Sequence, residues 1–163
     1  MILRVVLEGL VLGALLILLC AIGIRKSPVN MVYLYPSQVQ ERCVKLGLTT
    51  HNKIKRGRAI FKAICIPGYI IYSLVCVYAI NDTRGFLAGF WQIAAILFIT
   101  NLIDRFLVDE YWVEHTRALV SPGPDDLQPY ISLRDKVIKW LFGTVGVAIL
   151  AAILSGIAAL ITR

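Results

Sequence analysis

The chain alternates between long apolar runs and shorter polar connections. Four runs contain at most one charged residue each and reach the roughly 17 to 25 residues that a helix needs to cross a bilayer. They extend from Val5 to Ile24, from Ala59 to Ile80, from Phe86 to about Ile103, and from Val137 to Ile161. This pattern predicts an all-α, polytopic integral membrane protein: a single four-helix domain over residues 1–163 with four transmembrane helices.

Composition agrees with this prediction, because 58% of the 163 residues are hydrophobic, which is more than one soluble core requires. The first run resembles a signal peptide in having Arg4 before it. However, it is longer than a usual signal-peptide core and is followed at once by Arg25 and Lys26. We therefore expect it to remain in the protein as a membrane anchor.

The distribution of Lys and Arg predicts the orientation. Positive residues collect in cytoplasmic connections, and here they are dense in the first connection, sparse in the second, which holds Arg84, and intermediate in the third. Both termini are therefore expected outside the plasma membrane, with the two long connections in the cytoplasm. The net charge of +7 suits contact with anionic membrane lipids, so we expect lipid partners and no nucleic acid. The basic residues are Arg25, Lys26, Arg42, Lys45, Lys53, Lys55, Arg56 and Arg58 in the first connection, and Arg117, Arg134, Lys136 and Lys139 in or beside the third.

The first connection is too long for a simple turn and contains an amphipathic pattern. After Pro36, Ser37 and Gln40 have the spacing of a capping box, and Gly47 ends the pattern. This predicts a short amphipathic cytoplasmic helix that lies on the bilayer or covers the cytoplasmic end of the bundle. Its apolar side would carry Val39, Cys43 and Leu46.

The third helix changes character along its length. It begins as an apolar span and is expected to continue as a charge-dense helix to about Arg117. Because polar groups near a span are costly unless they serve a purpose or meet water, this half is the candidate site. Its chemistry-bearing residues are Asn101, Asp104, Arg105, Asp109, Glu110, Tyr111, Trp112, Glu114 and His115.

Helical projection divides these residues into two stripes. Asp104 and His115 fall close together at about 100° per residue, and Asn101 and Tyr111 lie near them. Arg105, Asp109 and Trp112 form the second stripe, in which Arg105 and Asp109 have the i,i+4 spacing of an ion pair. We expect one stripe to line a cytoplasm-facing pocket between the second and third spans while the ion pair braces it. The predicted ligand-binding residues are Asn101, Asp104, Arg105, Asp109, Tyr111, Trp112 and His115.

Asp104 and His115 are also the candidate catalytic residues, since a histidine and a partly buried carboxylate can exchange protons. No metal or other cofactor is expected, because the carboxylates and His115 do not share one face and no HExxH motif or repeated CxxC occurs. The competing interpretation is that a helix becomes polar simply where it leaves the membrane. Whether the protein is an enzyme stays open.

Three hypotheses follow. The first is binding of an amphiphilic or lipid-like ligand at the third helix, with or without acid-base chemistry. The second is a subunit of a dimeric, proton-coupled transporter with Glu8 as the coupling carboxylate, although Glu8 could instead form an interfacial pair with Arg4. The third is an accessory protein of a larger membrane complex. A homo-oligomer could use the Gly9–Gly13 pair, or the strip of small residues Thr144, Ala148, Ala152 and Gly156, as its interface.

Overall fold

The computed structural model describes residues 1–112 and 132–161, and the regular elements within them are all helical. Four of the helices are long and apolar enough to cross a membrane, as predicted. The first is α1 (Ile2–Ile24), and the second combines α3 (His51–Leu74) with the wider η2 (Val75–Ile80). The third combines α4 (Phe86–Ile103) with η3 (Asp104–Trp112), and the fourth consists of α6 (Leu133–Leu141), η6 (Phe142–Gly146) and α7 (Val147–Ile161).

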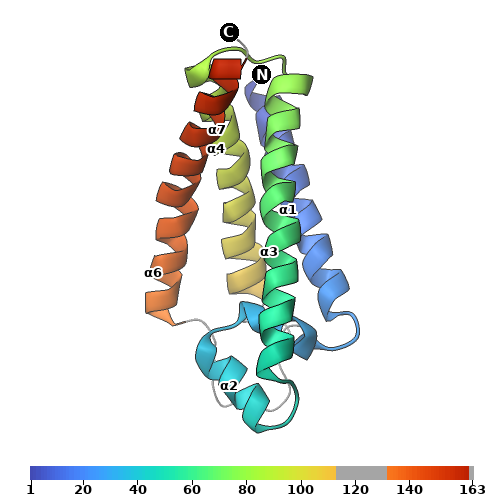
Figure 1. Ribbon diagram of the computed structural model, residues 1–163. Helices are drawn as coiled ribbons and strands as arrows, with labels where there is room; N and C mark the ends of the chain where they lie inside the picture. Colours follow the sequence, from blue (N-terminus) through green and yellow to red (C-terminus); the bar gives the residue numbers. More distant parts are fainter. Residues whose placement is uncertain (113–131, 162–163) are drawn as a thin grey trace.

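Helix α4 is the centre of the bundle and packs along both α1 and α7 (Figure 1). It is apolar on all sides, as expected of a helix with neighbours around it. Ile93 and Ile96 are completely buried, and so is the polar Gln92. Both chain termini lie at one end of the bundle, and the short helix α2 lies at the other (Figure 1).

The Gly9–Gly13 pair is used within this chain, where it brings α1 against α4. A Cβ atom at Gly9 would lie 2.8 Å from the Cβ of Ile99, and one at Gly13 would collide with Ile103. Small residues permit this close approach of two helix backbones. The glycine face is therefore covered by α4 and is not exposed for a dimer.

The last span meets α4 through a row of residues next to the predicted strip. Gly143, Ala151 and Ser155 are buried, whereas Thr144 is exposed and Gly156 faces open space. Gly143 lies directly against the side chain of Asn101, so a Cβ atom there would overlap the amide. Small residues occur both in the predicted strip and in the buried row beside it. Residue size alone therefore did not indicate which row packs against α4.

Helix α3 is attached mainly near its two ends. Thr50 caps its first turn by accepting a hydrogen bond from the backbone N–H of Lys53 at 3.3 Å. Near this end Ile54 joins one hydrophobic cluster. Near the far end Ser73 is buried, and Cys76 and Val77 of the following η2 join a second cluster, which contains the α4 core. The helix continues through Pro67 without interruption.

The connection between α1 and α3 forms η1 (Pro28–Leu34) and α2 (Ser37–Lys45). Val39 and Cys43 of α2 are buried beneath it with Leu16 and Met31, so this helix covers the end of the bundle. The Ser37 side chain makes no cap hydrogen bond, because Ser37 is already the first helical residue and Pro36 holds the cap position. The Gln40 side chain instead donates to the Tyr35 carbonyl at 2.5 Å.

Candidate functional site

A cavity of about 620 Å³ lies between the α2 end of the bundle and its middle. Residues of α1, η1, α3, η3, α6 and η6 line it. Its wall is largely apolar, and one side is charged. The apolar and sulfur-bearing lining includes Leu16, Cys20, Met31, Phe61, Cys65, Ile66, Tyr69, Val108 and Phe142, and the charged lining consists of Lys62, Asp104, Arg105, Asp109 and Lys139.

The π-helical geometry of η3 determines which side chains reach the cavity. A π-helix bonds residue i to i+5 and has wider turns than the α-helix assumed in the sequence projection. Asp104 and Asp109, five residues apart, therefore line the same cavity, together with Arg105 and Val108. The two stripes expected from the sequence are not separated here: members of both face one space.

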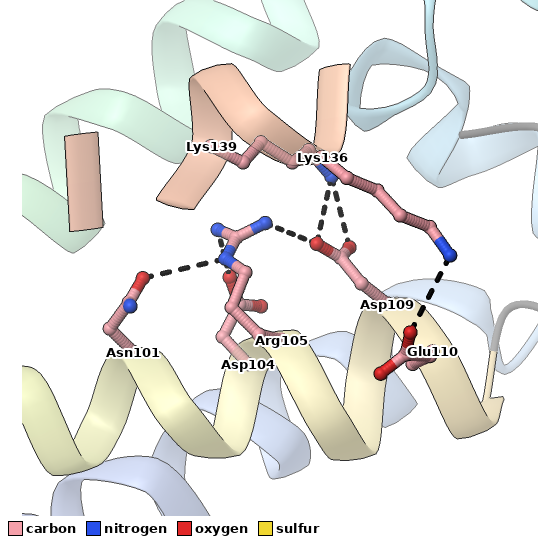
Figure 2. A network of polar contacts seen from close by, with 7 residues as sticks. All are labelled: Asn101, Asp104, Arg105, Asp109, Glu110, Lys136 and Lys139. Atoms are coloured by element: carbon pink, nitrogen blue, oxygen red, sulfur yellow. Dashed lines mark hydrogen bonds and ion pairs between the residues drawn. The ribbon is translucent and has the colours of Figure 1, made fainter. Parts of the chain in front are cut away.

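Arg105 joins the acidic residues of η3 (Figure 2). Its guanidinium donates to Asp104 Oδ2 at 2.6 Å and to Asp109 Oδ2, and its Nε donates to Asn101 Oδ1 at 3.4 Å. The i,i+4 pair of Arg105 and Asp109 expected from the spacing is present. These contacts fix the orientation of both carboxylates, because each is tied to a cation on the same helix.

A second helix supplies the remaining charge. Lys139 of α6 donates to both carboxylate oxygens of Asp109, at 3.0 and 2.9 Å (Figure 2). One turn earlier, Lys136 pairs with Glu110 at 3.5 Å. The sequence indicated Lys139 only as a basic residue in or beside the third connection, and nothing in its local pattern indicated a partner thirty residues earlier in the chain.

The resulting network (Asp104, Arg105, Asp109 and Lys139) is balanced in charge and half-buried. The side chains of Arg105 and Asp109 are 16% and 18% exposed, and that of Lys139 is 31% exposed. Water screens such a network less than it screens a surface pair. Two carboxylates and two cations therefore brace the charged side of the cavity and link η3 to α6.

Lys62 is the exception among the charged lining residues. It is exposed on α3, at the edge of the cavity. Within residues 1–112 and 132–161 no ion pair of its ammonium group is formed. Among the described residues, its position places a positive charge without an ion-pair partner at the edge of an apolar space.

The cavity reaches the side of the bundle between α3 and η6. Ile66 of α3 and Phe142 of η6 both line it, and both are largely exposed. α3 does not pack along α6 or α7, since α4 lies between them (Figure 1). The two edges of the cavity on this side, one on α3 and one on η6, are thus hydrophobic, and their helices are not packed against each other.

Other predicted site residues lie elsewhere. Asn101 contacts Arg105 but is not a lining residue, and its buried amide nitrogen has no hydrogen-bond partner among the described residues. Tyr111 is exposed and away from the cavity wall. Glu8 lies near the opposite end of the bundle, where it accepts a hydrogen bond from Asn81. The Trp112 side chain and the whole of His115 lie outside the described residues.

Sulfur groups were missed by the sequence as cavity residues. Cys20 and Cys65 come from α1 and α3 and line the same wall, although they are distant in the chain. In the described part of the chain none of the cysteines forms a disulfide, and no three His, Cys, Asp or Glu side chains converge on a metal position.

Comparison with protein-family models, curated proteins and solved structures gives no match.

Proposed function

We propose that this protein is a four-span plasma-membrane protein that binds a phospholipid-like amphiphile in the cavity beside η3. The observation that carries the proposal is the cavity itself, which combines an apolar wall, a charged side and hydrophobic edges at the surface of the bundle. Its volume lies within the roughly 300 to 1,000 Å³ typical of small-molecule sites. An amphiphile matches both parts of this lining.

The proposed orientation follows from charge and from the position of the chain ends. An even number of spans brings both termini to one end, as Figure 1 shows for the bundle. The basic first connection belongs to the opposite end, which carries α2. By the preference of positive residues for the cytoplasm, the termini are outside and the cavity lies near the cytoplasmic leaflet.

The apolar wall would hold part of an acyl chain. Ile66 and Phe142 stand at the edges, and Leu16 lies deeper and is nearly buried. Because α3 and η6 are not packed together, a chain could enter sideways from the leaflet without first crossing water. Because the acyl chain already lies in hydrocarbon within the leaflet, entry brings it little hydrophobic free energy, and affinity would come from packing against this wall together with the headgroup contacts.

The headgroup would meet the charged side. Arg105 and Lys139 are already paired with carboxylates, whereas Lys62 can pair with a phosphate. Asp104 bonds Arg105 through Oδ2, which leaves Oδ1 to accept a hydrogen bond from a headgroup hydroxyl or ammonium. The favoured ligand is therefore an amphiphile with an anionic phosphate next to a hydrogen-bond donor.

The cytoplasmic end of the cavity would be closed by η1 and α2. The Tyr33 hydroxyl donates to Met31 Sδ at 3.0 Å, and Met31 and Tyr35 line the cavity. Burial raises the pKa of the Tyr33 phenol above its ordinary value, so the group stays a neutral donor. This closed end would direct ligand entry to the side of the bundle.

Native mass spectrometry of protein extracted with its own lipids tests the proposal. We expect one phospholipid class to co-purify with the wild type and to be reduced about tenfold or more in Lys62→Gln. Lys55→Gln is the matched control, because Lys55 is an exposed lysine of the same helix that does not line the cavity. Equal retention in both variants would contradict the assignment of Lys62 to the headgroup.

A cavity-filling variant tests the acyl-chain part separately. Cys65→Phe places an aromatic ring in the lining, whereas Ala63→Phe adds the same ring at an exposed position of α3 outside the lining. We expect only Cys65→Phe to lose the bound lipid. Loss in both variants, or in neither, would show that the retained lipid is bound somewhere else.

A further inference from the structure

A second polar site lies at the end of the bundle opposite the cavity. It is formed by Glu8 of α1, Asn81 and Thr83 of the turn after η2, and Gln92 of α4, and we refer to these four residues as the Glu8 cluster. Gln92 is completely buried, Thr83 is buried, and Glu8 is only 9% exposed. No member of the cluster lines the cavity of about 620 Å³.

The donors of the hydrogen bonds in the cluster are the side-chain amides of Asn81 and Gln92. Gln92 Nε2 donates to Thr83 Oγ1 at 2.8 Å. Asn81 Nδ2 donates to Gln92 Oε1 and to Glu8 Oε2, each at 3.1 Å. Both amide nitrogens are thus used as donors within the cluster.

Among the residues that the structure describes, two buried acceptor atoms of the cluster have no hydrogen-bond partner: Glu8 Oε1 and Asn81 Oδ1. Buried polar atoms are normally paired, so two unpaired oxygens on side chains that contact each other through Asn81 Nδ2 and Glu8 Oε2 require explanation. What the cluster lacks is a donor or a positive charge. Another acceptor would not satisfy it.

The nearby groups do not supply that charge. Arg4 is exposed, and its guanidinium donates to the Ile80 carbonyl at 3.5 Å. Arg84 pairs with Asp82 at 2.6 Å, and both are exposed. Tyr72 donates its hydroxyl to the backbone carbonyl of Glu8 at 2.9 Å, not to the carboxylate.

The second span ends with η2 at Ile80, immediately before Asn81. The last carbonyl groups of a helix carry partial negative charge. Here three of them already accept hydrogen bonds: those of Cys76 and Val77 from the backbone N–H groups of Asn81 and Thr83, and that of Ile80 from Arg4. The demand for a positive charge therefore comes from the Glu8 carboxylate.

We propose that the Glu8 cluster binds a small monovalent cation, with Na⁺ as the probe, through Glu8 Oε1 and Asn81 Oδ1. Carboxylate and amide oxygens are hard ligands of the kind that group I and II cations accept. A single carboxylate neutralises one charge, which favours a monovalent ion over Ca²⁺ or Mg²⁺. This site is separate from the amphiphile cavity, and either proposal can fail without the other.

The test is the thermal unfolding of the detergent-purified protein in NaCl and in choline chloride at equal ionic strength. Trp91, the residue before Gln92, provides a fluorescence signal. Above the dissociation constant, each tenfold rise in Na⁺ should raise the wild-type Tm by about 3 to 5 °C. Glu8→Gln should abolish this dependence, and Asp82→Asn, which changes an exposed carboxylate at the same end, should retain it.

Binding of radioactive ²²Na⁺ to the wild type, competed by unlabelled Na⁺ but not by choline, provides a second measurement if Glu8→Gln does not fold. Three results would overturn the proposal. They are an identical wild-type Tm in the two salts together with no saturable ²²Na⁺ binding, a Na⁺ effect that persists in Glu8→Gln, and a Tm that responds to pH but not to Na⁺. The last result would make Glu8 a proton site.

Discussion

Asp109 is the residue of the candidate site that pairs with cations from two different helices. It receives Arg105 from its own helix and Lys139 from the last span, so it joins two elements that are distant in sequence. Removing one partner from a half-buried carboxylate leaves charge that solvent only partly stabilises. The network is thus expected to contribute to folding as well as to the shape of the cavity.

Replacement of Lys139 measures this contribution. We predict that Lys139→Met lowers the free energy of unfolding by about 1 to 3 kcal/mol, because Asp109 loses two hydrogen bonds. Lys136→Met, one turn away, should cost less than about 1 kcal/mol, because its partner Glu110 is 51% exposed. Denaturant titration of both variants in detergent micelles is the measurement, and equal losses would refute the special role of Asp109.

At the scale of elements, close packing of α1 on α4 holds the bundle together while α3 is attached mainly at its ends. The first contact depends on glycines, and the second leaves room for the cavity. The widening of α4 into η3 then places the acidic residues on the cavity side. Close packing is therefore found between α1 and α4, whereas the accessible cavity lies beside α3.

Glycine substitutions distinguish these pairs. Gly9→Ala is predicted to destabilise the protein by about 1 to 3 kcal/mol, because the new methyl group meets Ile99. Gly68→Ala on α3 should be neutral or stabilising by up to about 1 kcal/mol, since its added Cβ meets nothing within 4 Å and alanine favours helix. Thermal unfolding of the two variants compares them, and a loss at Gly68 similar to that at Gly9 would contradict this arrangement.

The seal formed by α2 makes a separate prediction. Val39→Asp introduces a charge beneath α2, where Val39 and Cys43 are buried, and should loosen the helix from the bundle. The Cys43 thiol should then react with maleimide at least about tenfold faster. Leu46→Asp is the control, because Leu46 is exposed on the same connection. If Leu46→Asp accelerates the reaction as much, α2 does not cover the bundle end in the proposed way.

At the scale of the whole molecule, the sequence predicted the four long helices because each apolar run is long enough to cross a bilayer and contains at most one charged residue. The roles of Lys62 and Lys139 were not predictable in this way. Each depends on where a different helix packs, and single-helix projection contains no such information.

The π-helical turns of η3 were equally inaccessible from the sequence. A projection at α-helical spacing separates Asp104 from Asp109, and the wider turn brings both to the cavity. The sequence also did not predict which face of the last span packs against α4, because the buried row runs through Gly143 and Ala151 and not through the predicted strip. Local patterns thus identified the right segment and several of its residues, while the composition of the cavity came from packing between helices.

Membrane topology is the prediction that belongs to the whole chain. A cysteine introduced at Asp82, in the turn between η2 and α4, should react with a membrane-impermeant maleimide added to intact cells. One introduced at Lys45, at the end of α2, should react only after the membrane is opened. The reverse pattern would invert the orientation and place the cavity in the outer leaflet.

The central claim, that a lipid-like amphiphile occupies the cavity, is tested most directly by photo-crosslinking. The protein is reconstituted with a phospholipid that carries a photoreactive group in its acyl chain, and the modified residues are mapped by mass spectrometry. We predict an adduct at Leu16, which lines the cavity and is only 7% exposed, in addition to adducts at outward-facing residues such as Ile64. The Leu16 adduct should disappear in Cys65→Phe and persist in Ala63→Phe. Adducts at Ile64 and other outward residues alone would show that lipid surrounds the bundle without entering it, and would contradict the account.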